Sequence, residues 1–359
     1  MSLQPVRAPE VRPFPKPCVI LRPMESWLLD VVCCPLCRGA LVGEASAARC
    51  GVCGELYPLR DGVLDLHPSP SVESRQEMAA HEAMAARWLD EIVPAHLHPR
   101  LTGEAGNRLH WSFPRVEDKE LAAAVPQFKR LDDIAEDYFE LLDWLRLERD
   151  DVVVEVGAHM GWSARHLAER AGRVVATDIS PHLRHARNYW TDSARFECVY
   201  SNMEAFPFRD RSLDLIFGVA TIHHLADLTG FFKHCRRALR PGGRAVFFAE
   251  PVAGRWDAEA RERFGAEEKA MGIQEHIYSI GEYFAAARRA GLRPGVVPMT
   301  SLMRDPRRNW PRLRRIGLWL IESGLGRRWL FRRVVYRLML VFYSRIPFPH
   351  FALVLSKPA

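Results

Sequence analysis

Short apolar runs alternate with amphipathic segments along the second half of the chain, from Asp151 onward. The runs are rich in β-branched residues and have the length of buried strands; they are VVVEVG, RVVATDI, RFECVYSN, LDLIFGVA and RAVFFAEP. Helical segments such as SARHLAERA and LTGFFKHCRRAL separate them. This alternation predicts βαβ units, and therefore an α/β fold with a parallel sheet covered by helices on both faces.

Two more apolar runs, RPGVVPM and HFALVLSKPA, predict the last two strands, which follow the helix YSIGEYFAAARRAGL. A stretch of about 45 residues separates these strands, and a structureless loop of that length is uncommon in a compact domain. We therefore expect a folded helical insertion at residues 301–346, before a last strand within 347–359. Within RRWLFRRVVYRLMLVFY the apolar residues fall on one helical face and the arginines on the other.

The first half of the chain is more polar and divides into three parts. Residues 1–28 are rich in proline and arginine without an apolar core segment, so we expect a disordered tail and no signal peptide. Residues 29–68 form a cysteine-rich module, and 69–125 a helical linker that leads into the main domain at 126–300. With no signal peptide and no long uncharged apolar stretch, the expected location is cytoplasmic.

The net charge of +6 is unevenly distributed. Residues 301–346 hold 12 arginines against Asp305 and Glu322, a net +10, so the remaining chain carries −4. An anionic partner is therefore expected at the insertion, either an anionic membrane surface with the protein peripheral to it, or RNA. The alternative is an insertion helix that packs its apolar face on the sheet domain and exposes its arginines to water.

Two C-x-x-C pairs lie in the cysteine-rich module. Twelve residues separate Cys34 and Cys37 from Cys50 and Cys53, a spacing that predicts one tetrahedral four-thiolate zinc site. Disulfides and unpaired core cysteines are the alternatives, and a reducing compartment disfavours disulfides. The surrounding segment, including YPLRDGV, resembles the zinc-ribbon modules attached to many bacterial methyltransferases, which implies a structural metal.

The strand at 152–156 ends in the turn Gly157-Ala158-His159-Met160-Gly161, followed by a helix. A glycine there lets the backbone approach a ligand closely, and the start of the helix favours negative charge. About 20 residues on, Asp178 ends the second strand, where a carboxylate can accept both hydroxyls of a ribose. The pattern predicts a nucleoside cofactor without separating NAD from S-adenosylmethionine.

The segments SNMEAFPFRDRSLDLIFGVATIHHL and LRPGGRAVFFAEP resemble class I S-adenosylmethionine-dependent methyltransferases, especially the group that contains the quinone-biosynthesis enzymes, over about residues 130–300. The resemblance implies a Rossmann-like, seven-stranded sheet and S-adenosyl-L-methionine as cofactor. It implies that Glu155, Gly157 and Gly161 line the methionine and ribose end of the cofactor, and that Asp178 binds the ribose hydroxyls. It also implies that Ile179 packs on the adenine ring, that Asn202 and Met203 meet the adenine edge, and that Ala220 lies along the cofactor.

Two positions depart from the family pattern. Family members commonly have Asp where Asn202 stands, and Asn keeps an acceptor oxygen for the exocyclic amine of adenine. His159 occupies the middle of the turn, where positive φ is tolerated better by His than by most residues. Its side chain either contacts the methionine carboxylate or the acceptor, or points to solvent as a turn residue.

Candidates for proton removal from an acceptor follow the later strands. His223 follows the fourth strand, Glu250 ends the fifth, and His276 lies in the acceptor-side segment GIQEHIYSIGEY. Structural roles for these residues, and a proximity mechanism without a base, remain alternatives. The expected function is methyl transfer to a small-molecule, saccharide or lipid-linked acceptor at oxygen. An RNA methyltransferase that grips RNA with the ribbon and the arginines is one alternative, and a non-catalytic cofactor-binding scaffold is another.

Overall fold

A computed structural model describes residues 25–67, 72–87, 93–101, 103–190, 195–253, 258–299 and 351–358. The expected arginine-rich insertion at 301–346 lies outside the described residues, as does the expected tail up to residue 24. The first described helix, α1 (Ser26–Val31), begins three residues before the expected start of the cysteine-rich module.

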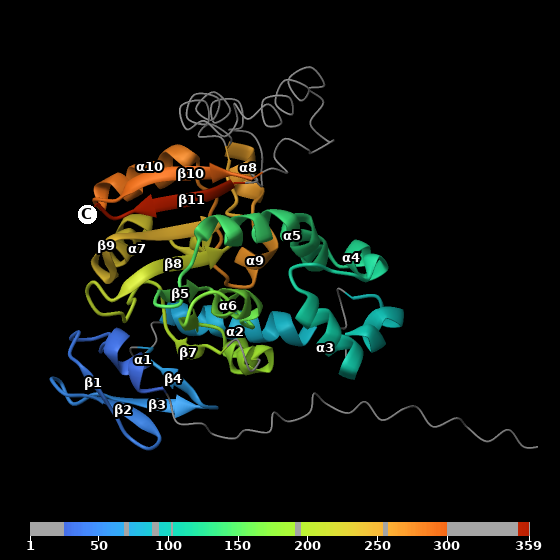
Figure 1. Cartoon of the computed structure of the whole chain (residues 1–359). Coiled ribbons are helices and arrows are strands. Elements are labelled where there is room, and N and C mark those ends of the chain that lie inside the picture. Colours follow the sequence, from blue (N-terminus) through green and yellow to red (C-terminus); the bar gives the residue numbers. More distant parts are fainter. Residues whose placement is uncertain are drawn as a thin grey trace, which may run out of the picture.

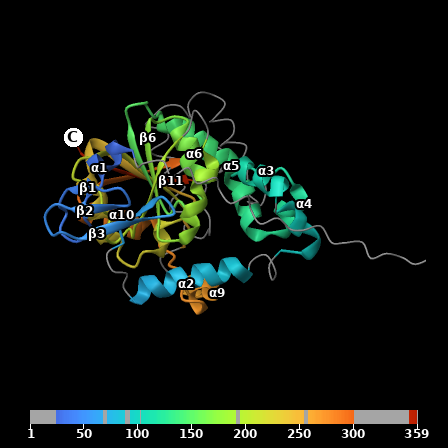
Figure 2. The ribbon, with the colours of Figure 1, turned by 90° about the horizontal axis from the view of Figure 1, so that it is seen from below.

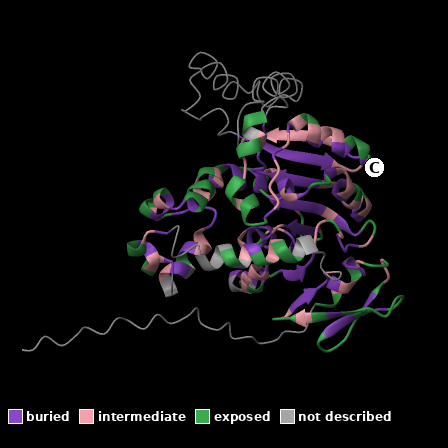
Figure 3. Cartoon of the chain, turned by 180° about the vertical axis from the view of Figure 1, so that it is seen from behind, coloured by how far each residue is buried: buried purple, intermediate pink, exposed green. Residues whose placement is uncertain are grey.

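The sheet of the main domain contains the strands expected from the apolar runs (Figures 1 and 3). Their spatial order is β7 (Glu197–Tyr200), β6 (Arg173–Asp178), β5 (Val152–Val156), β8 (Leu213–Val219), β9 (Leu239–Phe248), β11 (Phe351–Ser356) and β10 (Arg293–Pro298). Strands β7 to β9 are parallel, whereas β11 runs antiparallel to both β9 and β10. The two strands expected from RPGVVPM and HFALVLSKPA thus pair with each other.

The expectation of a seven-stranded sheet is wrong, because the described sheet has eleven strands. Four of them come from the cysteine-rich module: β1 (Leu41–Gly43), β2 (Ala47–Cys50), β3 (Leu56–Arg60) and β4 (Val63–Asp65). Strand β4 pairs in parallel with β7, with Leu64 opposite Val199. The backbone groups at the edge of β7 need hydrogen-bond partners, and the module supplies them.

Alternate residues of β5 face opposite sides of the sheet, as the two-residue period of a strand requires. Val152, Val154 and Val156 belong to one apolar cluster, which includes residues of α7 (Leu228–Ala238) and α10 (Ile280–Arg289). Val153 belongs to a second cluster, formed with α5 (Pro126–Leu145), α6 (Trp162–Ala168) and the 3-10 helix η3 (Pro181–Tyr189). Helices thus cover both faces, as expected.

The helical linker contains α2 (Val72–Arg87), η2 (Ala95–Arg100), α3 (Gly103–Ser112) and α4 (Lys119–Ala124). Leu97 and Leu121 of this linker form a third apolar cluster together with Phe128 of α5. Helix α2 extends along one edge of the main domain, near α9 (Ala266–Ala270), which follows α8 (Ala258–Arg263) (Figure 2). Across the described ranges, every helix is too short or too polar to cross a bilayer.

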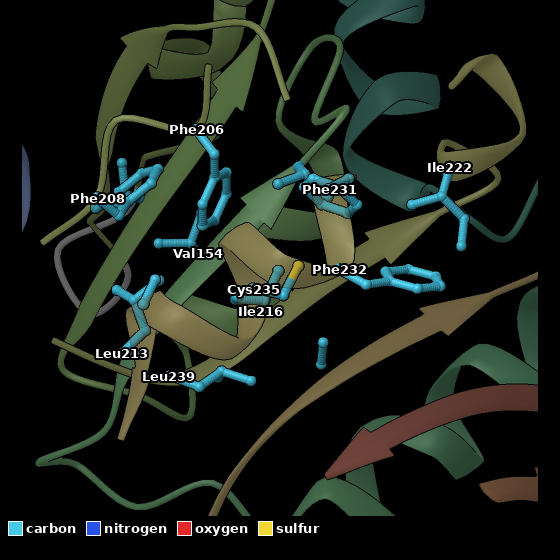
Figure 4. Packing of buried hydrophobic residues seen from close by; sticks show 14 of the residues in the cluster. Val154, Phe206, Phe208, Leu213, Ile216, Ile222, Phe231, Phe232, Cys235 and Leu239 are labelled. Atoms are coloured by element: carbon cyan, nitrogen blue, oxygen red, sulfur yellow. The ribbon is translucent and has the colours of Figure 1, made fainter. Parts of the chain in front are cut away.

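The cysteine-rich module also makes several polar contacts with the loop between β7 and β8. Val32 forms a bridge with Phe208, and the Cys33 N–H donates to the Pro207 carbonyl over 2.9 Å. The Arg38 guanidinium pairs with the Asp210 carboxylate over 2.8 Å. Phe206 and Phe208 pack into the core beside Val154 and α7 (Figure 4). The module is therefore fastened to the same loop that begins at Asn202.

Candidate cofactor and acceptor site

The carboxyl ends of β7, β6, β5 and β8 meet at one edge of the sheet. Parallel pairing sets Asp178 opposite Tyr200, and Val156 opposite both Thr177 and Gly218. The loops that follow these strands therefore lie next to one another, at the edge where open α/β sheets bind ligands. Every cofactor residue expected from the sequence belongs to a strand end or a loop at this edge.

The turn after β5 has the backbone conformation that its sequence predicts. Gly157 and Gly161 have φ of 66° and 80°, and a Cβ at Gly157 would overlap Thr221 Oγ1. His159 has φ of 48°, and its side chain is exposed apart from contact between its ring and that of His182, 5.0 Å away. The turn thus tolerates His159, and it requires glycine at 157 because Thr221 packs directly against that backbone.

Asp178 is the centre of the hydrogen bonding at this edge. Its Oδ2 accepts the backbone N–H of His159 over 2.6 Å, and its Oδ1 accepts that of Ser180 over 2.7 Å. Burial raises the pKa of the Asp178 carboxyl, and these two N–H groups oppose that rise. Each carboxylate oxygen keeps a further lone pair for a ligand hydroxyl. The arrangement fits the ribose role that the family resemblance implies.

Asn202 and Met203 begin the loop after β7. Asn202 Oδ1 accepts the Glu204 N–H over 2.8 Å, which fixes the amide at the start of the loop. An amide oxygen is the kind of acceptor that an exocyclic amine requires. Met203 and Ile179 are half-buried, and Met203 packs against the core. The family resemblance implies that both apolar side chains meet the adenine.

Glu155 is buried within β5. Its carboxyl accepts hydrogen bonds from the Ser163 side chain and the Ala164 N–H. Burial, reinforced by the charge of Asp178, raises the pKa of Glu155 to about 8. Its Oε2 has no partner within the described ranges. A buried carboxylate oxygen without a partner suits a ligand that brings an N–H donor, such as the ammonium of a methionine moiety.

Ala220 and Ala249, at the ends of β8 and β9, have positive φ of 48° and 56°. Non-glycine residues in this region are strained, and such strain gathers at functional sites. The Ala220 N–H donates to the Phe248 carbonyl over 2.8 Å, which ties the two strand ends together. The chain turns sharply at both points, and these turns bring His223 and Glu250 together.

His223, in the 3-10 helix η4 (Ile222–His224), and Glu250 form a buried pair. Glu250 Oε2 lies 2.9 Å from His223 Nδ1. The same carboxylate accepts the backbone N–H groups of Thr221, Ile222 and His223 at 2.8, 3.1 and 3.2 Å. The Glu250 carboxylate acts as the acceptor in these contacts, so His223 Nδ1 is the donor, and the acceptor nitrogen of a neutral imidazole in this position is Nε2.

Three further residues approach this pair from the segment after α9 and from η4. Glu275 Oε2 lies 3.5 Å from His223 Nε2, and Glu275 Oε1 lies 3.7 Å from His224 Nδ1. His276 is joined to the pair by its backbone, since its N–H donates to the His223 carbonyl over 2.9 Å, while its ring stacks on Tyr278. Of the three expected catalytic residues, the structure brings the side chains of His223 and Glu250 together.

Sequence reasoning missed two residues of α2, which it assigned to the linker. The Gln274 N–H donates to the Glu77 carboxyl. Burial, with the charges of Asp178, Glu204 and Glu275, raises the pKa of Glu77 to about 7. His81, one turn later, is close enough to Asp178 for the charges to interact. An i, i+4 pair of titratable residues among alanines was the available indication that α2 faces a site.

The four expected metal ligands converge in the cysteine-rich module. One sulfur from each of Cys34, Cys37, Cys50 and Cys53 lies within 4.8 Å of the others, and none forms a disulfide. Backbone N–H groups of Gly39 and Val52 point to the sulfurs of Cys37 and Cys50, each over 3.4 Å. Four converging thiols stabilised by N–H donors suit a tetrahedral metal with no open position.

Comparison with known proteins gives one family match and several relatives. Residues 154–247 match a family model described as a methyltransferase domain. The chain is 35% identical over 116 residues to malonyl-acyl-carrier-protein O-methyltransferase 1 of Coxiella burnetii, covering 32% of this chain and 38% of that protein. It is 28% identical over 209 residues to 27-O-demethylrifamycin SV methyltransferase of Amycolatopsis mediterranei, covering 56% and 71%. The first of these matches therefore spans little more than a third of the relative.

Among solved structures, geranyl diphosphate C-methyltransferase of Streptomyces coelicolor aligns with a TM-score of 0.45 and 18% identity, over 67% of this chain and 82% of that one. The family match runs from β5 into β9 and includes the expected cofactor residues and His223, whereas Glu250 and Glu275 lie outside it. The matched domain and its relatives support a class I S-adenosylmethionine-dependent methyltransferase.

Proposed function

We propose that the protein transfers the methyl group of S-adenosylmethionine to an oxygen atom of a small-molecule, saccharide or lipid-linked acceptor. One relative is named as an O-methyltransferase, and the other is named for a substrate that lacks an O-methyl group. Both names favour oxygen as the acceptor atom. The cofactor supplies the electrophilic methyl group, so the chain has to bind it, orient the acceptor and deal with the acceptor's proton.

The observation that carries the proposal is the pair of His223 and Glu250 beside the cofactor turn. A neutral hydroxyl is a weak nucleophile, and an O-methyltransferase gains from a group that makes the oxygen more anionic. Glu250 fixes the imidazole so that His223 Nε2 presents a lone pair, three residues after Ala220. Thr221 lies against Gly157, so the segment that carries His223 packs directly on the cofactor turn.

The other residues at this edge of the sheet each bind a different part of the cofactor. Asp178 accepts from the ribose hydroxyls, Glu155 accepts from the methionine ammonium, and Asn202 accepts from the adenine amine. Gly157 and Gly161 allow the positive φ of the cofactor turn, and Ile179 and Met203 enclose the adenine. This distribution matches donors and acceptors without leaving the Glu155 carboxylate oxygen unpaired.

The cysteine-rich module is proposed to hold a structural Zn²⁺ on Cys34, Cys37, Cys50 and Cys53. The convergence of the sulfurs supports a metal, and four thiolates of this kind select Zn²⁺. Because the module pairs with β7 and grips the loop that starts at Asn202, its metal would stabilise the adenine side of the site as well as the module.

The test is transfer of tritiated methyl from S-adenosylmethionine into cell extract separated into small-molecule, lipid and RNA fractions. The proposal is supported if label enters the small-molecule or lipid fraction and if the variant His223→Gln no longer transfers it. Label in RNA would instead indicate an RNA methyltransferase. Binding of the cofactor without label in any fraction would indicate a scaffold. An exposed histidine variant, His96→Gln, is the matched control.

A further inference from the structure

The cluster formed by His223, His224 and Glu275 contains more hydrogen-bond acceptors than donors. His223 Nδ1 donates to the Glu250 carboxylate, as argued above. His224 Nδ1 lies 2.6 Å from the Gln274 carbonyl oxygen, which can only accept, so that nitrogen carries a proton. In a neutral imidazole that is protonated on Nδ1, Nε2 keeps a lone pair. Glu275 adds a carboxylate to the same place.

The spacing of these groups does not match hydrogen bonds. His223 Nε2 and Glu275 Oε2 are 3.5 Å apart, whereas a charge-assisted N–H···O contact is typically about 2.7–2.9 Å. Two donors that each lie about 2.1 Å from a metal ion are separated by about 3.5 Å when the angle at the metal is near 110°. One donor atom from each of the three residues lies within 4.8 Å of the others.

The surroundings hold the three side chains in place from outside the cluster. A carboxylate behind the imidazole, as Glu250 lies behind His223, is a partner that metal-binding histidines ordinarily have. Gly265, with φ of 62°, lets the turn before α9 lie directly against Glu275, where a Cβ would overlap the Glu275 side chain. The neighbouring Phe264 ring contacts His223, with centroids 5.9 Å apart.

We propose that His223, His224 and Glu275 bind a divalent first-row metal ion at the acceptor side of the cofactor site. Two imidazoles and one carboxylate suit Mn²⁺, Fe²⁺, Co²⁺, Ni²⁺ or Zn²⁺, and three protein ligands leave coordination positions open. His224 is a quarter exposed, at 26%, whereas His223 and Glu275 are 8% and 10% exposed. The open positions therefore face outward on the side of His224.

The role of this metal rests on the proposed function. An acceptor hydroxyl bound to the ion becomes more acidic and releases its proton to water. The oxygen then forms a bond to the methyl carbon while the carbon–sulfur bond breaks, and the electron pair stays on sulfur to give S-adenosylhomocysteine. Such a metal site would favour acceptors whose reactive hydroxyl can bind a metal, such as phenols or hydroxyls next to a second oxygen.

The test uses Mn²⁺, which four thiolates bind poorly, so that a zinc-loaded ribbon does not interfere. Electron paramagnetic resonance of free Mn²⁺ during titration of the full chain measures the stoichiometry. We expect one Mn²⁺ per chain, with affinity at least about tenfold weaker in Glu275→Gln and about 10–100-fold weaker in Glu250→Gln, which alters the partner behind His223. His96→Gln, which alters an exposed histidine paired with Glu120, should leave the affinity unchanged.

Failure of this inference and failure of the proposed function give different results. No Mn²⁺ binding up to millimolar concentration, or binding that Glu275→Gln leaves unchanged, overturns the metal site. Methyl transfer that persists in metal-free buffer and depends on His223 would overturn it too, and would make His223 a general base. Mn²⁺ binding with the expected variant effects, but no methyl transfer, retains the metal site and removes the proposed function.

Discussion

The backbone N–H of His159 donates a hydrogen bond to Asp178 Oδ2 over 2.6 Å, so the glycine turn after β5 is fastened to the end of β6. This contact uses the backbone of His159 and not its imidazole, which is exposed. The residue that departs most from the family pattern therefore contributes a group that any amino acid other than proline would supply.

His159→Gly should leave the affinity for S-adenosylhomocysteine within about twofold of the original. Glycine adopts the φ of 48° without strain and keeps the N–H that Asp178 accepts. Isothermal titration calorimetry measures the affinity. A loss of more than about tenfold would show that the imidazole contacts the cofactor.

Asp178→Ala should weaken the same affinity by about 10–100-fold. The substitution removes acceptors for the ribose hydroxyls and leaves the His159 N–H without its partner; charge-assisted hydrogen bonds are worth about 1.5–3 kcal/mol each. Calorimetry on Asp178→Ala and His159→Gly side by side separates the carboxylate from the turn. Equal affinities for the two variants would contradict the role assigned to Asp178.

Much of this edge is predictable from sequence because its determinants are local. The β-branched runs define β5, β6 and β8, and the glycine spacing defines the turn. Asp178 follows at the end of the next strand. The C-x-x-C spacing likewise brings four sulfurs together, since each pair spans a single turn. In each case a few neighbouring residues determine the geometry.

Other features depend on contacts between distant segments. Strand β4 can pair with the edge of β7 only once both strands are folded, so no local sequence pattern indicates the eleven-stranded sheet. The distance between His223 and Glu275 depends on how the segment after α9 returns to η4. Helix α2 looks like a linker because its alanine-rich sequence does not specify which face Glu77 occupies. These relationships follow from packing, which periodicity does not encode.

Glu155→Gln should flatten the pH dependence of stability of the cofactor-free protein. Burial raises the pKa of Glu155 to about 8, above its value of about 4.5 in the unfolded chain, so the folded state binds the proton more tightly. That stabilisation is complete below about pH 4.5 and is lost as the pH rises through about 8. Urea unfolding from pH 5 to 8 should show a decline for the original protein that is smaller for the variant, by on the order of a few kcal/mol.

The other carboxyls with raised pKa values at this edge, Glu77, Asp178 and Glu275, are present in both proteins and therefore cancel in the comparison. If the free energy of unfolding of Glu155→Gln and of the original protein changed with pH in parallel, Glu155 would be ionised in the folded state near neutral pH despite its burial.

Loss of the ribbon metal should lower the affinity for the cofactor several-fold as well as the melting temperature. The module holds Pro207, Phe208 and Asp210, which lie in the loop that begins at Asn202, and couplings of this kind are worth about 0.5–2 kcal/mol. Cys50→Ser removes one ligand. Native mass spectrometry should then find less than one zinc per chain, and calorimetry a weaker cofactor affinity.

Cys33→Ala is the matched control for that experiment, because Cys33 is buried next to Cys34 but lies outside the four-sulfur cluster. It should retain one zinc and the original cofactor affinity. Unchanged affinity in metal-free Cys50→Ser would mean that the β4–β7 pairing holds the loop without help from the metal.

Glu250→Gln should lower kcat by about 100-fold or more while leaving the affinity for S-adenosylhomocysteine unchanged, within the range typical of lost proton-transfer assistance. The glutamine oxygen can still accept the N–H groups of Thr221 and Ile222, so the η4 turn is retained. What disappears is the charge behind His223 Nδ1 and, with it, the orientation of the Nε2 lone pair. Single-turnover methyl transfer and calorimetry on one preparation measure the two effects, with the exposed Glu136→Gln as control. A proportional loss of both quantities would assign Glu250 to the folding of the strand end, because a disturbed Ala220 turn would affect the cofactor and the acceptor alike.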